Sequence, residues 1–368
     1  MWGHPRNTRP LADRGGDALR IRRRSRAVNQ PVSGGRYDAA AMPTSSATID
    51  VRPLDSGDLD DAARLLADRH RRHRVAEPLL DPAYEDAAGA RDEIEALLAD
   101  ATAQGWTARR EGSFVGYLIS IAKDETTWGP NVWVEPAGHA ATAPEVVRAM
   151  YATAGDAWAD DKRFNQHAVV PASDASLVEA WFSLDFGQQH LHAVREVPPP
   201  AFGVRATSEL IVRRAAPHDV RTLAELELVL PNHMRGAPVF SRLPIQPLEE
   251  VVAEMEADWD DSKYTIFVAE HEGRVVGDAI AIDLKESPGN SSLIRPASAG
   301  FLGYAAVFAD ARGLGAGRAL GEAVLAWSRD AGYGAVATDW RSTNIEADRA
   351  WRGLGFRPTF RRLHRSIF

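Results

Sequence analysis

ADARGLGAGRALGEAVLAW, residues 309–327, is the stretch of sequence from which the fold can be worked out. It places three glycines ahead of apolar residues that recur at helical spacing up to Trp327. The apolar run 304–308 predicts a strand before it, and Gly332 predicts the end of the helix. In such an arrangement backbone N–H groups and the helix N-terminus point at an anion. The stretch therefore predicts an anion-binding loop.

The spacing of the glycines decides which anion the loop suits. The dinucleotide pattern G-x-G-x-x-G fails, because Arg318 stands where the third glycine should follow Gly313 and Gly315. The P-loop pattern fails for want of Gly-Lys-Ser/Thr. The pattern Arg/Gln-x-x-Gly-x-Gly/Ala fits at Arg312, Gly315 and Gly317. It resembles the pyrophosphate-binding signature of the GNAT superfamily, the acetyl-CoA-dependent N-acetyltransferases.

A second segment strengthens this resemblance. The family carries Asn-x-x-Ala-x-x-x-Tyr-x-x-x-Gly-Phe on the helix after the next strand, and Asn344, Ala347, Trp351, Gly355 and Phe356 stand at that spacing here. Thr343 and Glu346 predict a capping box for this helix. The strand between the two motifs is predicted over 334–340. Trp351 departs from the family pattern, which has Tyr at this position. Its indole N–H cannot supply the proton that a tyrosine hydroxyl would.

The chain also repeats itself, which predicts two copies of one unit. A strand, turn and helix pattern at 49–68 recurs at 210–229, and a hairpin pattern at 105–120 recurs at 267–282, both at an offset of 161 residues. We expect an α/β (α+β) protein of two tandem GNAT domains, each a mixed, mostly antiparallel sheet flanked by helices. The expected boundaries are 48–197 and 208–368, joined by a linker over 198–207.

The first copy lacks the glycine loop. Aligned on the strand before it, His139 stands in place of Arg312, Thr142 in place of Gly315 and Pro144 in place of Gly317. Proline has no amide hydrogen to donate. We therefore expect 48–197 to be a degenerate GNAT domain without a cofactor site.

The resemblance implies acetyl-CoA as co-substrate, with its pyrophosphate on the amides of 312–318 and its pantetheine beside Val307 and Phe308. The residues implied for this binding are Val307, Phe308, Arg312, Gly313, Leu314, Gly315, Ala316, Gly317, Arg318, Asn344, Ala347 and Trp351.

An amine would attack the thioester directly, and a general base should remove its proton because such amines are protonated at neutral pH. Asp339 is the candidate base, with a salt bridge to Arg341 or a loop cap as the alternative. Tyr304 is the candidate acid, with core packing as its alternative. His233 and Arg235, in the expected loop 230–244, are candidate substrate contacts or solvated side chains.

Composition narrows the remaining possibilities. A net charge of −8 favours neither nucleic acid nor an anionic membrane, and no apolar run approaches the length of a membrane-spanning helix. There is no cysteine, and HRRHR (70–74) has no acidic partners at ligand spacing, so we expect no metal and interpret it as a solvated face. Residues 1–47 carry nine arginines and predict a disordered basic extension, with Met42 a possible start.

The sequence thus predicts a cytoplasmic N-acetyltransferase, monomeric or homodimeric, that acetylates a primary amine of a small molecule. One alternative is a non-catalytic acyl-CoA-binding or scaffold protein, which Trp351 and the degenerate first half suggest. A further alternative is a protein N-acetyltransferase.

Overall fold

The computed structural model describes residues 48–124, 128–199, 210–241, 243–261, 263–287 and 292–367. Thr48–Phe368 forms one compact unit. The predicted basic extension, and most of the predicted linker, lie outside the described residues.

The first half alternates strands and helices as the repeat predicts. Its elements are β1 (Ile49–Pro53), α1 (Leu59–Ala76), α2 (Ala87–Leu98), β2 (Gln104–Arg110), β3 (Ser113–Lys123), β4 (Asn131–Val134), β5 (His139–Ala141), α3 (Pro144–Asp160), β6 (Asn165–Pro171), α4 (Ala175–Phe182) and β7 (Gly187–Glu196). The predicted hairpin is confirmed, since β2 and β3 pair antiparallel.

The second half repeats the order. Its elements are β8 (Leu210–Arg214), α5 (Val220–Arg235), α6 (Leu248–Ala257), β9 (Thr265–His271), β10 (Arg274–Asp283), β11 (Gly300–Val307), α7 (Ala316–Asp330), β12 (Ala335–Arg341), α8 (Ile345–Gly353) and β13 (Arg357–Ser366). The hairpin of β9 and β10 is likewise confirmed.

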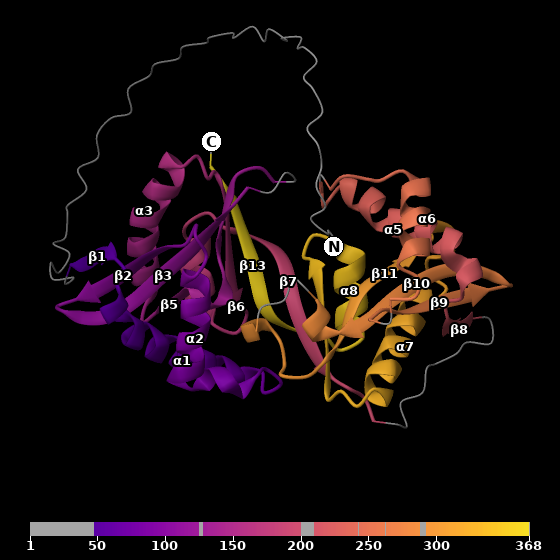
Figure 1. Cartoon of the computed structure of the whole chain (residues 1–368), viewed down its shortest axis with the longest axis horizontal. Coiled ribbons are helices and arrows are strands. Elements are labelled where there is room, and N and C mark those ends of the chain that lie inside the picture. Colours follow the sequence, from indigo (N-terminus) through magenta and orange to yellow (C-terminus); the bar gives the residue numbers. More distant parts are fainter. Residues whose placement is uncertain are drawn as a thin grey trace, which may run out of the picture. The chain divides into compact units, whose positions relative to one another are not determined.

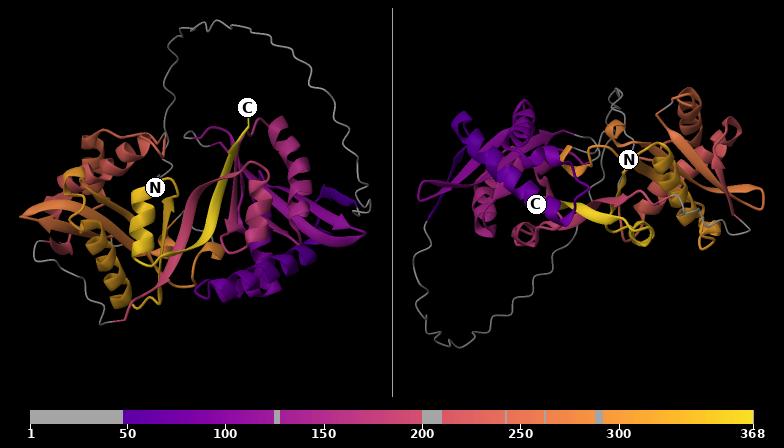
Figure 2. Two further views of the ribbon diagram at one scale, coloured as in Figure 1. Left: turned by 180° about the vertical axis from the view of Figure 1, so that it is seen from behind. Right: turned by 90° about the horizontal axis from the view of Figure 1, so that it is seen from below.

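All these strands join one sheet, in the order β1-β2-β3-β4-β6-β13-β7-β12-β11-β10-β9-β8, with β5 beside β3. Most neighbours are antiparallel, whereas β4 with β6 and β11 with β12 are parallel. Successive residues of β13 point to opposite faces of the sheet. Phe360 packs with α1 and α2 on one face, and Leu363 packs with α3 and α4 on the other. In the second half α7 covers the face of Leu191, and α5 covers the other. We name these the α3/α7 face and the α1/α5 face (Figures 1 and 2).

The two halves exchange their last strands. Strand β13, the last of the second half, lies between β6 and β7 of the first half, and β7 lies between β13 and β12. Figure 1 shows the yellow β13 beside the pink β7. Neither half therefore completes its sheet from its own residues.

An ion-pair network fastens this exchange at the start of β13. The Arg357 guanidinium donates to both carboxylate oxygens of Glu196 at 2.8 Å and to both of Glu77 at 3.0 Å. Glu77 follows α1, so three segments of the chain meet at one side chain. Bidentate guanidinium–carboxylate pairs are among the stronger polar contacts.

The structure corrects the interpretation of HRRHR. Arg71 and Arg72 are exposed, but His70 and His73 are buried on the inner side of α1. The ring of His73 packs edge-on against Phe360 of the exchanged strand, at 4.8 Å between ring centres. The stretch is therefore half surface and half core.

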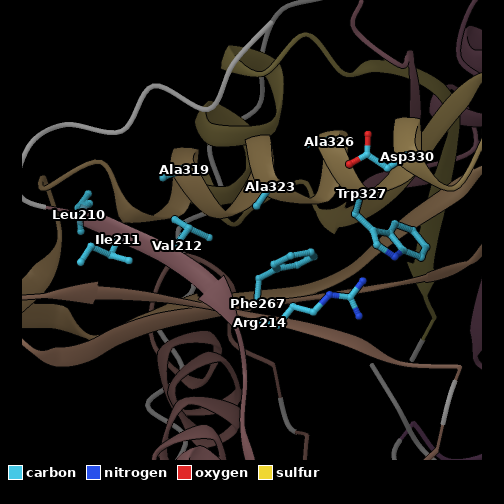
Figure 3. A pocket seen from close by; sticks show the side chains of 10 residues that line it. All are labelled: Leu210, Ile211, Val212, Arg214, Phe267, Ala319, Ala323, Ala326, Trp327 and Asp330. Atoms are coloured by element: carbon cyan, nitrogen blue, oxygen red, sulfur yellow. The ribbon is translucent and has the colours of Figure 1, made fainter. Parts of the chain in front are cut away.

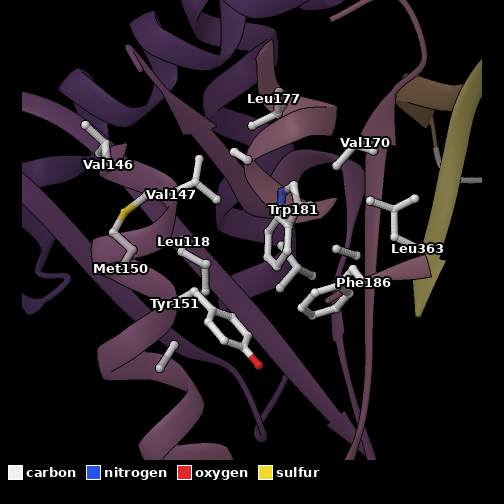
Figure 4. Packing of buried hydrophobic residues seen from close by; sticks show 14 of the residues in the cluster. Leu118, Val146, Val147, Met150, Tyr151, Val170, Leu177, Trp181, Phe186 and Leu363 are labelled. Atoms are coloured by element: carbon white, nitrogen blue, oxygen red, sulfur yellow. The ribbon is translucent and has the colours of Figure 1, made fainter. Parts of the chain in front are cut away.

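Trp181 is the centre of the first half's core on the α3/α7 face. It is fully buried, and Phe186 and Tyr151 lie edge-on to it at 4.9 and 6.1 Å (Figure 4). Val146, Val147 and Met150 of α3 belong to the same cluster. This packing joins α3 and α4 to the sheet.

We predict that Trp181→Ala lowers the free energy of unfolding by about 3–5 kcal/mol, because it leaves a large cavity. The measurement is equilibrium denaturation by urea. Phe182→Ala, at the neighbouring and partly exposed aromatic residue, is the control and should cost much less. Equal losses in the two variants would contradict this account of the core.

Candidate active site

The second half contains two parallel strands that part midway. Strands β11 and β12 pair only from Gly300 with Val336 to Leu302 with Thr338. Beyond this point β11 carries a bulge at Gly303, because Ile280 pairs with Tyr304 while Ala281 pairs with Leu302. A bulge bends its strand away from the regular ladder. We call the opening that follows, between residues 304–307 of β11 and 339–341 of β12, the splay.

Val307 presents backbone groups to this splay. The Phe308 N–H donates to Val276 O at 2.9 Å and the Phe308 carbonyl accepts from Ala311, so both polar groups of Phe308 are already used. Because hydrogen-bonding directions alternate along a strand, the groups of Val307 point away from β10. Of the two residues predicted to meet pantetheine, Val307 alone has its backbone available.

The loop from 308 to 315 leads from the splay to the start of α7. Gly313 and Gly315 adopt left-handed φ angles of 89° and 87°, which side-chain-bearing residues rarely adopt. A Cβ at either position would meet no atom within 4 Å, so the space around this loop is open. Ala319 N–H bonds to Gly315 O, and the amides of Ala316, Gly317 and Arg318 form the first turn, where N–H groups have no partner inside the helix.

Charged side chains surround this turn. Arg312 Nη1 lies 3.1 Å from Glu346 Oε1, and His233 Nε2 lies 3.5 Å from Glu346 Oε2. Arg318 extends beside its own helix, 2.9 Å from Glu322. The loop, α5 and α8 thus converge on one acidic residue. Leu314 is partly exposed at the tip of the loop.

Two local expectations need correction. The N-cap of α8 is Asn344, whose side chain accepts from Ala347 N–H at 3.2 Å, so Thr343 is not the cap and Glu346 is free to pair with Arg312. The expected loop 230–244 begins only at Gly236, because α5 continues through Pro231. His233 and Arg235 therefore lie on its last turn.

Trp351 packs as a core residue. It is 8% exposed, and its ring lies edge-on to Phe356 in the cluster that joins α7, α8 and the sheet. A Cβ on Gly321 would lie 3.5 Å from its ring. The indole therefore fills the space between the two helices.

The two predicted catalytic side chains both lie on the α1/α5 face and are both engaged. Tyr304 is buried, and its hydroxyl donates to Leu226 O of α5 at 2.6 Å. Burial, followed by the nearby carboxylates, raises the pKa of Tyr304 above its ordinary value. Core packing, the alternative for Tyr304, describes this position.

Asp339 accepts a hydrogen bond from His190 Nε2 at 2.8 Å, a partner that neither the base assignment nor its alternatives named. His190 comes from β7, so this pair is shared between the halves. Burial lowers the pKa of His190 to about 3, and its imidazole is neutral. Burial opposes ionisation of Asp339, but the interaction with His190 outweighs it and holds the pKa of Asp339 below its ordinary value. An acid as strong as this is a weak base.

A second acidic group on the same face was not expected. Asp278 of β10 is 2% exposed, and its Oδ1 is buried without a hydrogen-bond partner in the described part of the chain. It pairs in register with Ala306, beside the splay. Burial, then the charge of Glu227, raises its pKa well above the ordinary value.

Glu227 completes this acidic pair. It lies on α5 one turn after the buried Leu223 and is only partly exposed. Burial, and the charge of Glu254 on α6, raise its pKa. The sequence held one signal for the pair, since Asp278 interrupts an otherwise apolar strand in VVGDAIAI (275–282).

The corresponding place in the first half is filled. Strand register sets His139 opposite Leu118, where the second half has Ala305 opposite Ala279, so the expected match of His139 with Arg312 is wrong. His139 Nε2 donates to Val169 O of β6 at 2.9 Å, across the gap between the parting strands. Trp181 packs edge-on against its ring.

The loop of the first half is also shorter. Residues 142 and 143 alone connect β5 to α3, whereas residues 308–315 connect β11 to α7. Arg69 of α1 is buried and donates to the carbonyls of Pro136 and His139. Because the loop is so short, it lacks the amides that would receive a phosphate.

One pocket of the second half lies away from this site. It separates β8 and β9 from α7 and is lined by Val212, Phe267, Ala323 and Trp327 among others (Figure 3). None of the predicted site residues lines it.

Comparison with known proteins identifies the family. Residues 237–356 match the model of the acetyltransferase (GNAT) family. The chain is 34% identical over 152 residues to an aminoglycoside N(6')-acetyltransferase type 1 of Stenotrophomonas maltophilia, covering 41% of this chain and 88% of that protein. The chain belongs to the GNAT family and is an acyltransferase.

Solved structures extend the likeness of fold to both halves. A GCN5-related N-acetyltransferase from Sphaerobacter thermophilus aligns over 86% of this chain and 95% of its own, with a TM-score of 0.54 and 17% identity. A fungal glucosamine N-acetyltransferase region aligns over 87% of this chain and 38% of its own, with a TM-score of 0.50 and 15% identity. The predicted fold class is confirmed.

The described residues contain neither a membrane-spanning helix nor a group of metal ligands. No helix there is long and apolar enough to cross a membrane. No three His, Cys, Asp or Glu side chains there lie close enough together to hold a metal ion.

We predict that His139 makes the protein sensitive to acid. Burial, then the charge of Arg69, lowers its pKa to about 3, against 6.5 in the unfolded chain. Below pH 6.5 the unfolded chain binds a proton that the native state cannot, so stability present above pH 6.5 is lost as the pH falls toward 3. From pH 7 to pH 5 this one group should cost about 2 kcal/mol.

The measurement compares urea denaturation of the wild type and His139→Gln at both pH values. Gln cannot titrate, so the variant should lose about 2 kcal/mol less than the wild type over this interval. The difference between the two proteins cancels the contributions of other titrating groups. Parallel losses would show that His139 ionises freely in the native state.

Proposed function

We propose that the second half binds acetyl-CoA and transfers its acetyl group directly to a primary amine of a small molecule. The observation that carries the proposal is the open loop with left-handed Gly313 and Gly315, which leads from the splayed strand to the first turn of α7. Unpaired amides at a helix N-terminus bind phosphate groups. Arg312 and Arg318, both exposed, add positive charge beside them.

The acidic pair Glu227 and Asp278 supplies the base that the amine needs. A base is effective when its pKa approaches the working pH, and burial moves the pKa of both carboxyl groups in that direction. Glu227 is the more exposed of the two and accepts the proton from the incoming ammonium group. The carboxyl group of Asp278 holds its proton more tightly than an exposed carboxyl group would, because burial and the charge of Glu227 raise its pKa.

This assignment replaces Asp339 as the base, because its hydrogen bond from His190 lowers its pKa. Tyr304 anchors α5 to β11 and so holds Glu227 beside the splay. The Val307 N–H is the donor to the developing oxyanion. The thiolate leaves without a phenolic acid, since a thiol pKa near 8.5 makes thiolate a tolerable leaving group.

The charge of α6 and of the turn that follows it supports a cationic acceptor. Residues 248–261 contain seven acidic side chains and no lysine or arginine. An acidic surface attracts ammonium groups before they are deprotonated. The curated relative is named for aminoglycosides, which supports an amine on a small molecule in this chain.

Two other functions would give different results. A non-catalytic acyl-CoA-binding protein would bind CoA and release no thiol with any amine. A protein N-acetyltransferase would acetylate peptides better than small amines. Measurement of CoA thiol release against a panel of small amines and peptides separates the three.

We predict that Gly315→Glu weakens CoA binding about tenfold or more. The substitution puts a carboxylate beside the expected phosphates, and the left-handed φ adds about 1–2 kcal/mol of strain. The measurement is isothermal titration calorimetry with CoA. Gly334→Glu, in open space without a left-handed φ, is the control and should bind as the wild type does. Unchanged affinity in Gly315→Glu would exclude this loop as the binding site.

We predict that Glu227→Gln lowers kcat about a hundredfold or more, because the amide cannot accept the proton. In the wild type, kcat should fall as the pH drops through the raised pKa of Glu227, and this acidic limb should vanish in the variant. Glu225→Gln, exposed on the same helix, is the matched control. A variant that keeps both the rate and the acidic limb would rule out Glu227 as the base.

A further inference from the structure

A row of basic side chains crosses the exchanged strands on the α1/α5 face. In strand register Arg362 of β13 pairs with His190 of β7, and His190 pairs with Arg341 of β12. A second row runs beside it, in which Trp133 of β4 pairs with His167 of β6 and His167 with His364 of β13. We call these six residues, together with Trp128, the central basic cluster.

Aromatic rings hold the cluster together. His167 stacks between Trp133 and His364, with ring centres 4.3 and 4.7 Å apart. The guanidinium groups of Arg341 and Arg362 lie 5.6 and 5.4 Å from the ring centre of Trp128. Both arginines are therefore drawn to one indole from neighbouring parts of the sheet, and both remain partly exposed.

Several polar atoms of the cluster are buried without a partner. His167 is 2% exposed, and neither of its ring nitrogens has a hydrogen bond within the described residues. The same holds for Nδ1 of His190 and Nε of Arg341. Leaving such groups unpaired costs free energy, and native proteins seldom do so without a ligand or water to satisfy them.

The electrostatics point to a ligand of negative charge. Burial, then the positive charges of His364, Arg362 and Arg341, lowers the pKa of His167. The carboxylate of Asp339 pairs with His190 Nε2, on the side of the ring opposite Nδ1. Planar guanidinium groups bind carboxylate and phosphate oxygens through two parallel hydrogen bonds.

The cluster also lies beside the proposed reaction site. Arg341 is two residues beyond Asp339 on the same face of β12, about 7 Å along the strand. Strand β12 forms one side of the splay. One small molecule would thus be long enough to place its anion on Arg341 and its amine at the splay.

We propose that the acceptor carries an oxyanion, a carboxylate or a phosphate, which the central basic cluster binds while its amine lies at the splay. This inference rests on the proposed function, because it names the class of acceptor for the same site. Arg341 binds the oxyanion, Arg362 extends the positive field, and Trp128 holds both guanidinium groups in one orientation.

The experiment compares acceptors that differ only in the anion. Two pairs are used, β-alanine with β-alaninamide and phosphoethanolamine with ethanolamine, so that one pair tests carboxylate and the other phosphate. We expect kcat/KM to be about tenfold or more higher for the anionic member of at least one pair, as a charged hydrogen bond allows. Equal or lower values for the anionic members of both pairs would overturn the proposal.

Variants of Arg341 locate the effect. Arg341→Met should remove the preference for the anionic acceptor by raising KM, with little change in kcat for the neutral one, and Arg341→Lys should restore part of it. Arg361→Met is the matched control, since Arg361 is half-buried on β13 but faces the opposite side of the sheet. A preference that survives in Arg341→Met, or disappears equally in Arg361→Met, would contradict the assignment.

A binding measurement keeps this inference separate from the proposed function. Inorganic phosphate is titrated into the wild type and Arg341→Met by calorimetry, each with CoA present at saturation. Binding by the wild type that weakens about tenfold in the variant supports the anion site even if no amine is acetylated, whereas thiol release with neutral amines alone supports the function without it. If no amine is acetylated, absence of phosphate binding by the wild type overturns the inference.

Discussion

The exchange of β7 and β13 is the constraint on which the rest of this structure depends. The backbone groups of a sheet must be paired, and here the pairing of each half is completed by a strand of the other. Separation of the halves would expose the edges of β6 and β12 and break the pairs of Arg357 with Glu77 and Glu196. The halves therefore form one cooperative unit, and both the His190–Asp339 pair and the central basic cluster exist only because strands of both halves alternate there.

The two halves share one topology, but only the second keeps an open site. In the second half the strands part around open space, and the loop that follows leaves its glycines and amides exposed. In the first half His139 bridges the parting strands, and Arg69 binds the carbonyls of Pro136 and His139. One copy retains the geometry of a binding site, while the other has converted it into a packed core that supports the α1/α5 face.

Local features of the fold could be predicted from the sequence, and pairings between distant segments could not. Glycine spacing, helical periodicity and the repeat are visible within short windows, so the glycine turn before α7 and both hairpins could be predicted. Which half a final strand joins depends on interactions of the assembled sheet, and nothing within β13 itself encodes its neighbours.

The contacts within the candidate site could not be predicted for the same reason. Asp339 and Tyr304 both lie just beyond the last paired residues of β11 and β12, but their partners, His190 and Leu226, lie 149 and 78 residues away along the chain. The match of His139 with Arg312 was wrong because the two halves were aligned without a gap. The loop before α3 is six residues shorter than the loop before α7, and nothing in the sequence marks that difference. One buried acidic residue, Asp278, did leave a local signal, because it interrupts an otherwise apolar strand.

The position of β13 also has a consequence for synthesis. Strand β6 is translated long before the strand that lies beside it, since about 190 residues separate Pro171 from Phe360, their pairing point. At ordinary elongation rates of about 5–20 residues per second, that edge stays uncovered for roughly ten to forty seconds in each new molecule. The half made first thus waits for the half made last, and a ribosome that stalls between them leaves an open sheet edge that chaperones must protect.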